Sequence, residues 1–192
     1  KLEGTLQVEP EIRDDYTWDA LANMMRLRKQ HHKLDDKALA DFYKMTEKQV
    51  RDLQEMLEYA AVYLGARGKS RHWSLVSDKE YEFRKMLDKR KAVTDAGAKK
   101  LFEECAFSLI DDPTGRRLYE SIPDVQKYLP RIREKLRDRF PLPKGNNYVL
   151  NNDDDLFGVV DSHSQQDITL AEQIGKAENR YDAALLIKEV ID

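Results

Sequence analysis

Two short amphipathic segments and the turn between them fill residues 39–53, which read LADFYKMTEKQVRDL. Ala40 supplies the small side chain that two sharply crossing helices need where they approach each other. Thr46 opens the second segment, and Gln49 three residues later completes the sequence signature of a capping box. Apolar side chains recur on the inner face of both segments, at Leu39, Tyr43, Val50 and Leu53. The pattern predicts a helix-turn-helix across residues 35–57.

The second helix of such a motif presents its N-terminus to the major groove of DNA. Among its outward side chains, Gln49 suits adenine and Arg51 suits guanine or a phosphate. Past this helix, a loop at residues 67–71 carries three cations and no acid, which suits phosphates as well. The predicted DNA-binding residues are Lys44, Thr46, Glu47, Lys48, Gln49, Arg51, Arg67, Lys69 and Arg71.

Two features of the same region favour a different role. Lys44 occupies a turn position that is often glycine, where a left-handed backbone is needed. Glu47 and Asp52 place negative charge where phosphates would lie. Trp73, next to the basic loop, either stacks on a base or packs against the core. A helical adaptor, in which the two helices are only scaffold, therefore stays open.

Residues 17 to about 64 resemble the helix-turn-helix region of the ParB partition proteins. The likeness lies in ALANMMRL at 20–27, KLDDKALA at 33–40 and MTEKQV at 45–50. It covers about a quarter of the chain and implies duplex DNA binding in partition. The family's N-terminal nucleotide-binding domain, with its arginine-rich motif, has no counterpart here, so no nucleotide hydrolysis is implied for any residue. We expect residues 1–16 to be a leader or the end of a missing upstream domain.

Charge is divided unevenly along the 192 residues. From Asn151 to the end there are ten acidic and three basic residues, a net charge of −7, so the preceding part carries +4 of the total −3. A basic body suits a polyanionic partner, and an acidic tail suits a protein partner or the body itself. Basic runs at residues 84–91 and 131–139 are predicted to be solvated helix faces rather than binding sites.

Helical periodicity and capping signals continue through most of the chain, and no segment has the pattern of a strand. We expect an all-α fold: a multi-helix domain that contains the helix-turn-helix, followed by a partly irregular acidic C-terminal tail. Ser77, Thr94 and Thr169 are predicted to cap three of the helices, and the run PLPKGNN at 141–147 is predicted to open a linker. The predicted boundaries are 17–140 for the helical domain, 141–168 for the linker and 169–192 for a C-terminal helix.

No catalytic or metal-binding constellation is recognisable, so we predict no enzymatic activity within this chain, no cofactor and no metal. Cys105 is the single cysteine and lies in an apolar stripe, which favours a buried structural thiol and a reducing cytoplasm. No two histidines have the i, i+4 spacing of a helical zinc site, and no glycine-rich phosphate loop appears. No apolar run approaches the roughly 18 residues of a membrane span.

The sequence therefore predicts a cytoplasmic, nucleoid-associated protein that binds duplex DNA as a homodimer, in plasmid partition or transcription regulation. Two alternatives remain: a helical protein-interaction adaptor, and an accessory domain of a larger nucleic-acid-processing enzyme. The acidic tail offers a protein-binding segment in each case. Within it, residues 154–158, DDLFG, have the composition of a peptide that docks into a groove.

Overall fold

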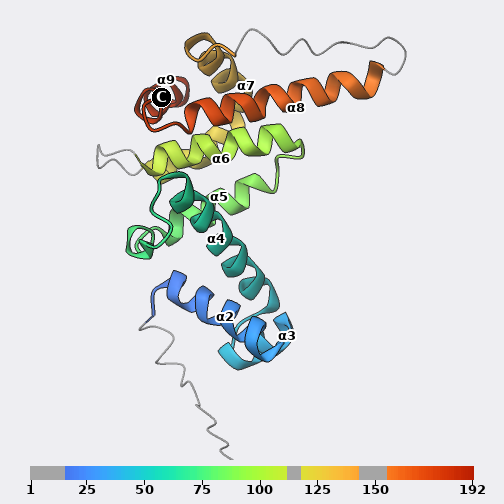
Figure 1. Ribbon diagram of the computed structural model, residues 1–192, viewed down its shortest axis with the longest axis vertical. Helices are drawn as coiled ribbons and strands as arrows, with labels where there is room; N and C mark the ends of the chain where they lie inside the picture. The colour runs from blue at the N-terminus through green and yellow to red at the C-terminus, as the bar shows by residue number, and fades with distance from the viewer. Residues whose placement is uncertain (1–15, 112–117, 143–154) are drawn as a thin grey trace, which may run out of the picture. The chain divides into compact units, whose positions relative to one another are not determined.

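The computed structural model describes residues 16–111, 118–142 and 155–192, and most of them are helical (Figure 1). These residues contain eight α-helices and two short 3-10 helices and no strand, which confirms the predicted all-α class. None of the described helices is long and apolar enough to cross a membrane. The elements are α2 Trp18–His32, α3 Asp36–Tyr43, α4 Glu47–Ala66, η1 Trp73–Leu75, α5 Glu80–Arg90, α6 Ala96–Ile110, η2 Leu118–Ser121, α7 Ile122–Arg139, α8 Asp155–Ile174 and α9 Arg180–Ile191.

The chain divides into two compact units, unit 1 over residues 1–84 and unit 2 over residues 85–192. The sequence predicted instead one helical domain over residues 17–140. The difference arises because α6 and α7 share their core with α8 and α9, which lie beyond the predicted linker. A linker signal in the sequence therefore marks a connection within unit 2 rather than the end of a domain.

In unit 1, α2 and α3 both pack against α4. The Trp18 indole N–H donates to the carbonyl of Val76 at 3.0 Å, and the Trp18 ring lies 5.7 Å from that of Phe83. These contacts join the start of α2 to the segment before α5 and to the first turn of α5 itself. The predicted inner-face residues Leu39, Tyr43, Val50 and Leu53 are confirmed as buried. The core of the unit also includes Leu21, Met25, Ala40, Met56 and Leu57.

All three helix caps predicted after α4 are wrong, and the first two concern α5 and α6. α5 begins at Glu80, so Ser77 lies outside it, and the Ser77 hydroxyl donates instead to a backbone carbonyl of the preceding turn at 3.2 Å. Asp95 rather than Thr94 caps α6, because its carboxylate accepts a hydrogen bond from the N–H of Ala98 at 2.7 Å. The charged carboxylate of Asp95 also interacts favourably with the positive end of the helix dipole. The neutral hydroxyl of Thr94 would not provide this charge interaction.

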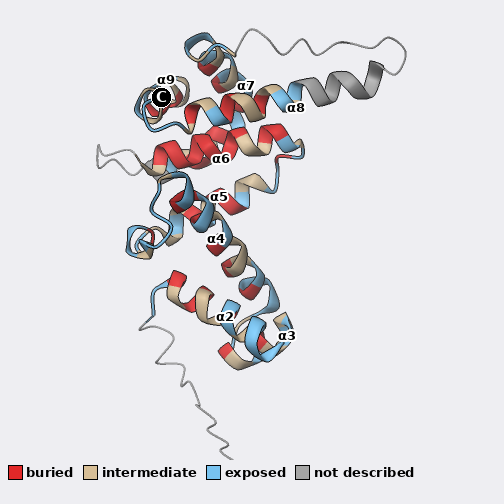
Figure 2. Cartoon of the chain, viewed as in Figure 1, coloured by how far each residue is buried: buried red, intermediate tan, exposed pale blue. Residues whose placement is uncertain are grey.

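α6 is the central helix of unit 2 and packs against α7, α8 and α9 (Figure 2). Every residue from Leu101 to Leu109 is buried, as expected for a helix surrounded on all sides. Two acids belong to this stretch. Glu103 pairs with Arg90, and Glu104 pairs with Lys100 at 3.2 Å, so both buried carboxylates have a cationic partner.

The prediction of a linker up to residue 168 is wrong from Asp155 onward. α8 starts there and continues through Thr169, whose hydroxyl donates to a carbonyl one turn earlier in the same helix at 2.9 Å, so Thr169 caps nothing. The helix forms despite its polar composition because a stripe on it packs against α6, with Leu170, Ala171 and Ile174 fully buried. The predicted helix over 169–192 is instead the end of α8, a turn and α9.

Three further predictions lie partly outside the described residues: the leader at 1–16, the first part of the linker at 143–154 and the docking peptide at 154–158. Of the docking peptide, residues 155–158 belong to α8. α6 and α8 lie close together at Gly97, whose N–H donates to the hydroxyl oxygen of Ser164 at 2.8 Å.

The acidic residues of α8 and α9 neutralise most of the basic run at residues 131–139. That run was predicted to be a solvated face, but its cations pair within unit 2. The N···O distances are 2.6 Å for Arg133–Asp167, 3.3 Å for Arg137–Asp167, 2.6 Å for Arg139–Asp182 and 3.1 Å for Lys135–Glu189. Asp167 is buried, whereas the side chains of Asp182 and Glu189 are 41% and 59% exposed, so the Asp167 pairs are the ones that matter for stability.

Candidate nucleic-acid interface

The turn between α3 and α4 consists of Lys44, Met45 and Thr46. Lys44 adopts the left-handed conformation, with φ 53° and ψ 47°, although it is not glycine. That conformation costs a non-glycine residue about 1–2 kcal/mol. The hydrogen bond from the Met45 N–H to the carbonyl of Ala40, at 2.9 Å, helps to hold the turn closed. The side chain of Lys44 is exposed at the junction of the two helices.

The predicted capping box at the start of α4 is confirmed. The N–H of Gln49 donates to the hydroxyl oxygen of Thr46 at 3.2 Å, and the N–H of Thr46 donates to the side-chain oxygen of Gln49 at 2.8 Å. Two backbone donors that the helix itself leaves unpaired are thereby satisfied. The box fixes where α4 begins, and it leaves Glu47 and Lys48 exposed in the first turn.

The hydrogen bonds of this capping box limit how Gln49 can recognise a base. A glutamine recognises adenine with both ends of its amide, the oxygen accepting and the nitrogen donating. In this structure the Gln49 oxygen is already engaged by the N–H of Thr46. Gln49 would have to give up the cap in order to make the bidentate contact, so its first role is structural.

Both cations on the first turns of α4 are paired with acids of the same helix. Arg51 contacts Glu47 at 3.3 Å, and Lys48 contacts Asp52 at 3.3 Å. Arg51 and Glu47 are about half exposed, and Lys48 is more exposed still, so each pair contributes at most about 1 kcal/mol. A phosphate or a base edge can displace such weak pairs, although the acids reduce the local positive charge.

Arg28 of α2 also lies close to the turn between α3 and α4, although no signal in the sequence predicted this. Its guanidinium carbon lies 4.2 Å from the ring centre of Phe42 and 5.8 Å from that of Tyr43, just before the turn. Burial raises the pKa of the Tyr43 phenol, and the charge of Arg28 works against that rise. Since Arg28 and Phe42 are fourteen residues apart on different helices, no local spacing in the sequence predicts their contact.

The basic loop after α4 does not join the other predicted residues. α4 has 20 residues, so at 1.5 Å per residue its two ends lie about 30 Å apart. A helix whose N-terminus enters a groove directs its C-terminus away from the same DNA segment. Arg67 is also engaged locally, because it donates to the carbonyl of Tyr63 at 3.1 Å and lies 3.8 Å above that ring. Lys69 and Arg71 are exposed.

The structure thus gathers six of the predicted residues at one end of α4 and leaves three at the other. Comparison of the chain with known protein families, with curated proteins and with solved structures finds no match. The resemblance to the partition proteins therefore stays a prediction. Within the described ranges, no group of three His, Cys, Asp or Glu side chains is placed to hold a metal ion.

Proposed function

We propose that unit 1 binds duplex DNA through a helix-turn-helix formed by α3 and α4, with the N-terminus of α4 in the major groove. The observation that carries the proposal is the capped and exposed start of α4 directly after the three-residue turn. A helix N-terminus has a partial positive charge and suits phosphates. Cations around it supply further contacts: Arg28, Lys44, Lys48 and Arg51.

The structure changes the roles that we assign within this surface. Arg51 and Lys48 are the proposed contacts to bases and phosphates, Lys44 is a phosphate contact, and Gln49 and Thr46 hold the helix start in place. Lys69 and Arg71 are not proposed to contact the same DNA segment. On this proposal the protein acts in the cytoplasm on the nucleoid, in partition or regulation, and it binds as a homodimer because one short helix reads few bases.

A protein-interaction adaptor is the second candidate, and the two ion pairs on α4 favour it. Because Glu47 and Asp52 each pair with a cation of the first turns, this surface has less net positive charge to attract phosphates than its cations alone would supply. The third candidate is an accessory domain of a larger nucleic-acid-processing enzyme. It requires the same DNA contacts as the first candidate and differs from it only in the other domains of the full protein.

The deciding experiment is fluorescence-anisotropy binding of the chain to random-sequence duplex DNA across a salt series. Lys48→Ala/Arg51→Ala is the test variant, and Lys69→Ala/Arg71→Ala is the control, because it removes the same charge at the far end of α4. We expect the test variant to bind at least about tenfold more weakly and to lower the salt slope by about 2, with the control near the wild type. Equal losses in both variants, or no binding at low salt, would favour the adaptor.

A further inference from the structure

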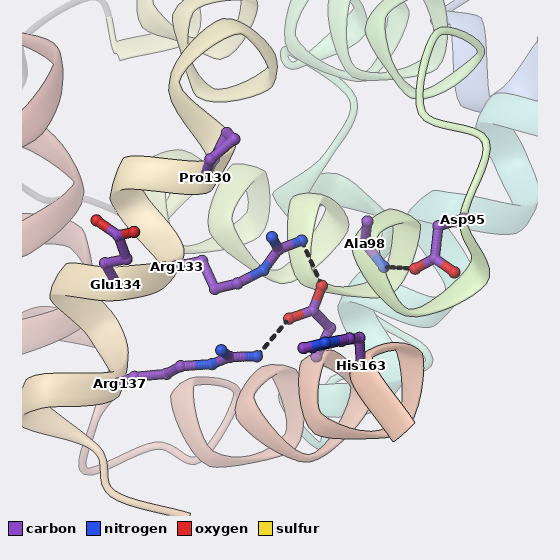
Figure 3. A pocket seen from close by; sticks show the side chains of 8 residues that line it. Asp95, Ala98, Pro130, Arg133, Glu134, Arg137 and His163 are labelled. Carbon is purple, nitrogen blue, oxygen red and sulfur yellow. Dashed lines mark hydrogen bonds and ion pairs between the residues drawn. The ribbon is translucent and has the colours of Figure 1, made fainter. Parts of the chain in front are cut away.

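Two groups of ion pairs, one in each unit, differ in whether a partner molecule can reach them. In unit 2, Arg133 and Arg137 point toward the carboxylate of Asp167, in the pocket between α7, α8 and the start of α6 (Figure 3). Asp167 is 4% exposed, and its loss would leave two cations uncompensated, so these groups serve the fold. In unit 1, Arg51 and Glu47 lie 3.3 Å apart on the surface of α4, with side chains 56% and 50% exposed. A partner molecule can therefore contact both members of the second pair.

The exposed side chains at the start of α4 suit different contacts. From Glu47 to Arg51, every side chain except that of Val50 is exposed. The oxygen of Gln49 is already used in the capping box, and Lys48 ends in a single ammonium group that suits a phosphate. Glu47 and Arg51 remain, and they lie on the same side of the helix because they are one turn apart. Recognition of bases by α4 therefore depends on these two residues.

The carboxylate of Glu47 interacts differently with phosphates and with bases. It repels the phosphates of every sequence alike, so it lowers the affinity for DNA in general. In the major groove, cytosine presents an amino group that donates to a carboxylate, whereas guanine and thymine present oxygens that repel it. Adenine presents its amino group beside an acceptor nitrogen, which also disfavours a carboxylate. An exposed carboxylate at this position therefore favours cytosine over the other three bases.

Asp52, the other acid of these turns, is less able to take the same role. Its side chain is 13% exposed, against 50% for Glu47, and it pairs with Lys48 at 3.3 Å. A recessed carboxylate cannot approach the edge of a base without carrying the helix deeper into the groove. The two acids have the same charge and differ in exposure, so Asp52 provides a control for Glu47.

We propose that Glu47 and Arg51 make this interface selective for G·C base pairs. Glu47 accepts a hydrogen bond from the amino group of a cytosine, and Arg51 donates to O6 and N7 of a guanine. Their charged groups are 3.3 Å apart, close to the roughly 3.4 Å between successive base pairs, so the two bases belong to neighbouring pairs. Glu47 engages Nη1 of Arg51, and Nη2 can still donate to the guanine. This inference rests on the DNA binding proposed above.

The test is selection of binding sites by the full chain from a random duplex library, followed by competition between duplexes that differ at one base pair. Glu47→Gln replaces the carboxylate with an amide, which recognises adenine instead of cytosine. Arg51→Lys keeps the charge and removes the planar pair of donors that fits guanine. Asp52→Asn is the matched control, because it removes the same charge from the recessed acid.

We expect the wild type to prefer cytosine to adenine by about tenfold at one position, and guanine at its neighbour. Glu47→Gln should reverse the first preference, so that the adenine duplex binds at least as tightly as the cytosine duplex. Arg51→Lys should weaken the preference for guanine, and Asp52→Asn should keep both preferences. If Glu47 had only a structural role, its substitution would change affinity or stability without changing which base is selected.

The outcomes separate this inference from the function on which it rests. Duplex binding in which Glu47→Gln keeps the preference of the wild type would overturn the inference and leave DNA binding intact. The same conclusion would follow if the wild type selected no base, or if Asp52→Asn changed the preference as much as Glu47→Gln. Absence of any duplex binding would overturn both.

Discussion

The backbone of Ser164 crosses α6 so closely at Gly97 that a Cβ atom added to Gly97 would stand 2.0 Å from the Ser164 carbonyl oxygen. No side-chain rotation relieves such a clash, because the atom in the way belongs to the backbone. We expect Gly97→Ala to lower the free energy of unfolding by about 3 kcal/mol, since α6 and α8 must move apart. Thermal or urea denaturation followed by circular dichroism measures this.

Gly65→Ala is the matched control for that substitution. Gly65 lies in the last turn of α4, and the nearest atom to its added Cβ is the Ser70 hydroxyl oxygen at 3.9 Å. Alanine there should raise stability by about 0.5–1 kcal/mol through its better helix propensity. Opposite signs for the two substitutions are expected. A neutral Gly97→Ala would show that α8 does not pack against α6 at this point.

The pairing of Arg133 and Arg137 with the buried Asp167 predicts a second stability difference. Asp167→Asn should lower the free energy of unfolding by about 3 kcal/mol, because Arg133 and Arg137 would lose the charge that compensates them. Asp182→Asn removes a carboxylate that is 41% exposed and pairs with the more exposed Arg139, so its cost should stay below about 1 kcal/mol. Equal costs in chemical denaturation would mean that Asp167 is solvated rather than buried.

The acids of α4 predict a gain of DNA affinity. Glu47→Gln frees Arg51 and removes a negative charge from the start of the helix, so binding of duplex DNA should tighten severalfold, by about 0.5–1 kcal/mol. Glu58→Gln makes the same charge change three turns along α4 at another exposed position and should have a smaller effect. Anisotropy titrations at one salt concentration compare the two. Equal effects would mean that only net charge matters.

The single thiol should be unreactive in the folded protein. Cys105 is fully buried in α6, and burial raises the pKa of its thiol far above the usual range, with the carboxylates of Glu104 and Asp167 adding to the rise. Very little thiolate is then present at pH 8, so Ellman's reagent should react only as the protein unfolds. Ser70→Cys adds a thiol in the exposed loop and should react at once. Rapid labelling of the wild type would contradict the packing of α6.

The sequence predicted what depends on neighbours along the chain. The box between Thr46 and Gln49 is a contact over three residues, so residue types and spacing were enough to place the start of α4. The buried residues Leu39 and Tyr43 of α3 and Val50 and Leu53 of α4 followed from helical periodicity in the same way. Where local signals competed, as between Thr94 and Asp95, the prediction missed by one residue.

What escaped prediction depends on contacts between distant segments. Arg133 and Asp167 are 34 residues apart, and nothing in either local sequence indicates a pair. The polar stretch of α8 has the composition of a loop, and packing against α6 makes it helical. The distance between Arg51 and Lys69 likewise arises because α4 is one continuous helix. The sequence analysis assigned both residues to one DNA-binding surface because of their charge, but they lie near opposite ends of α4.

The burial of α6 on all sides bears on how the protein can be shortened. The acidic C-terminal part looks dispensable by composition, and deleting it would be a natural way to enhance binding to a polyanion. A fragment ending near residue 142 would uncover part of the buried surface of α6, because α8 and α9 both pack against that helix. Such a fragment should aggregate, and any tight, salt-resistant association with DNA that it displays would report exposed apolar surface rather than a liberated interface.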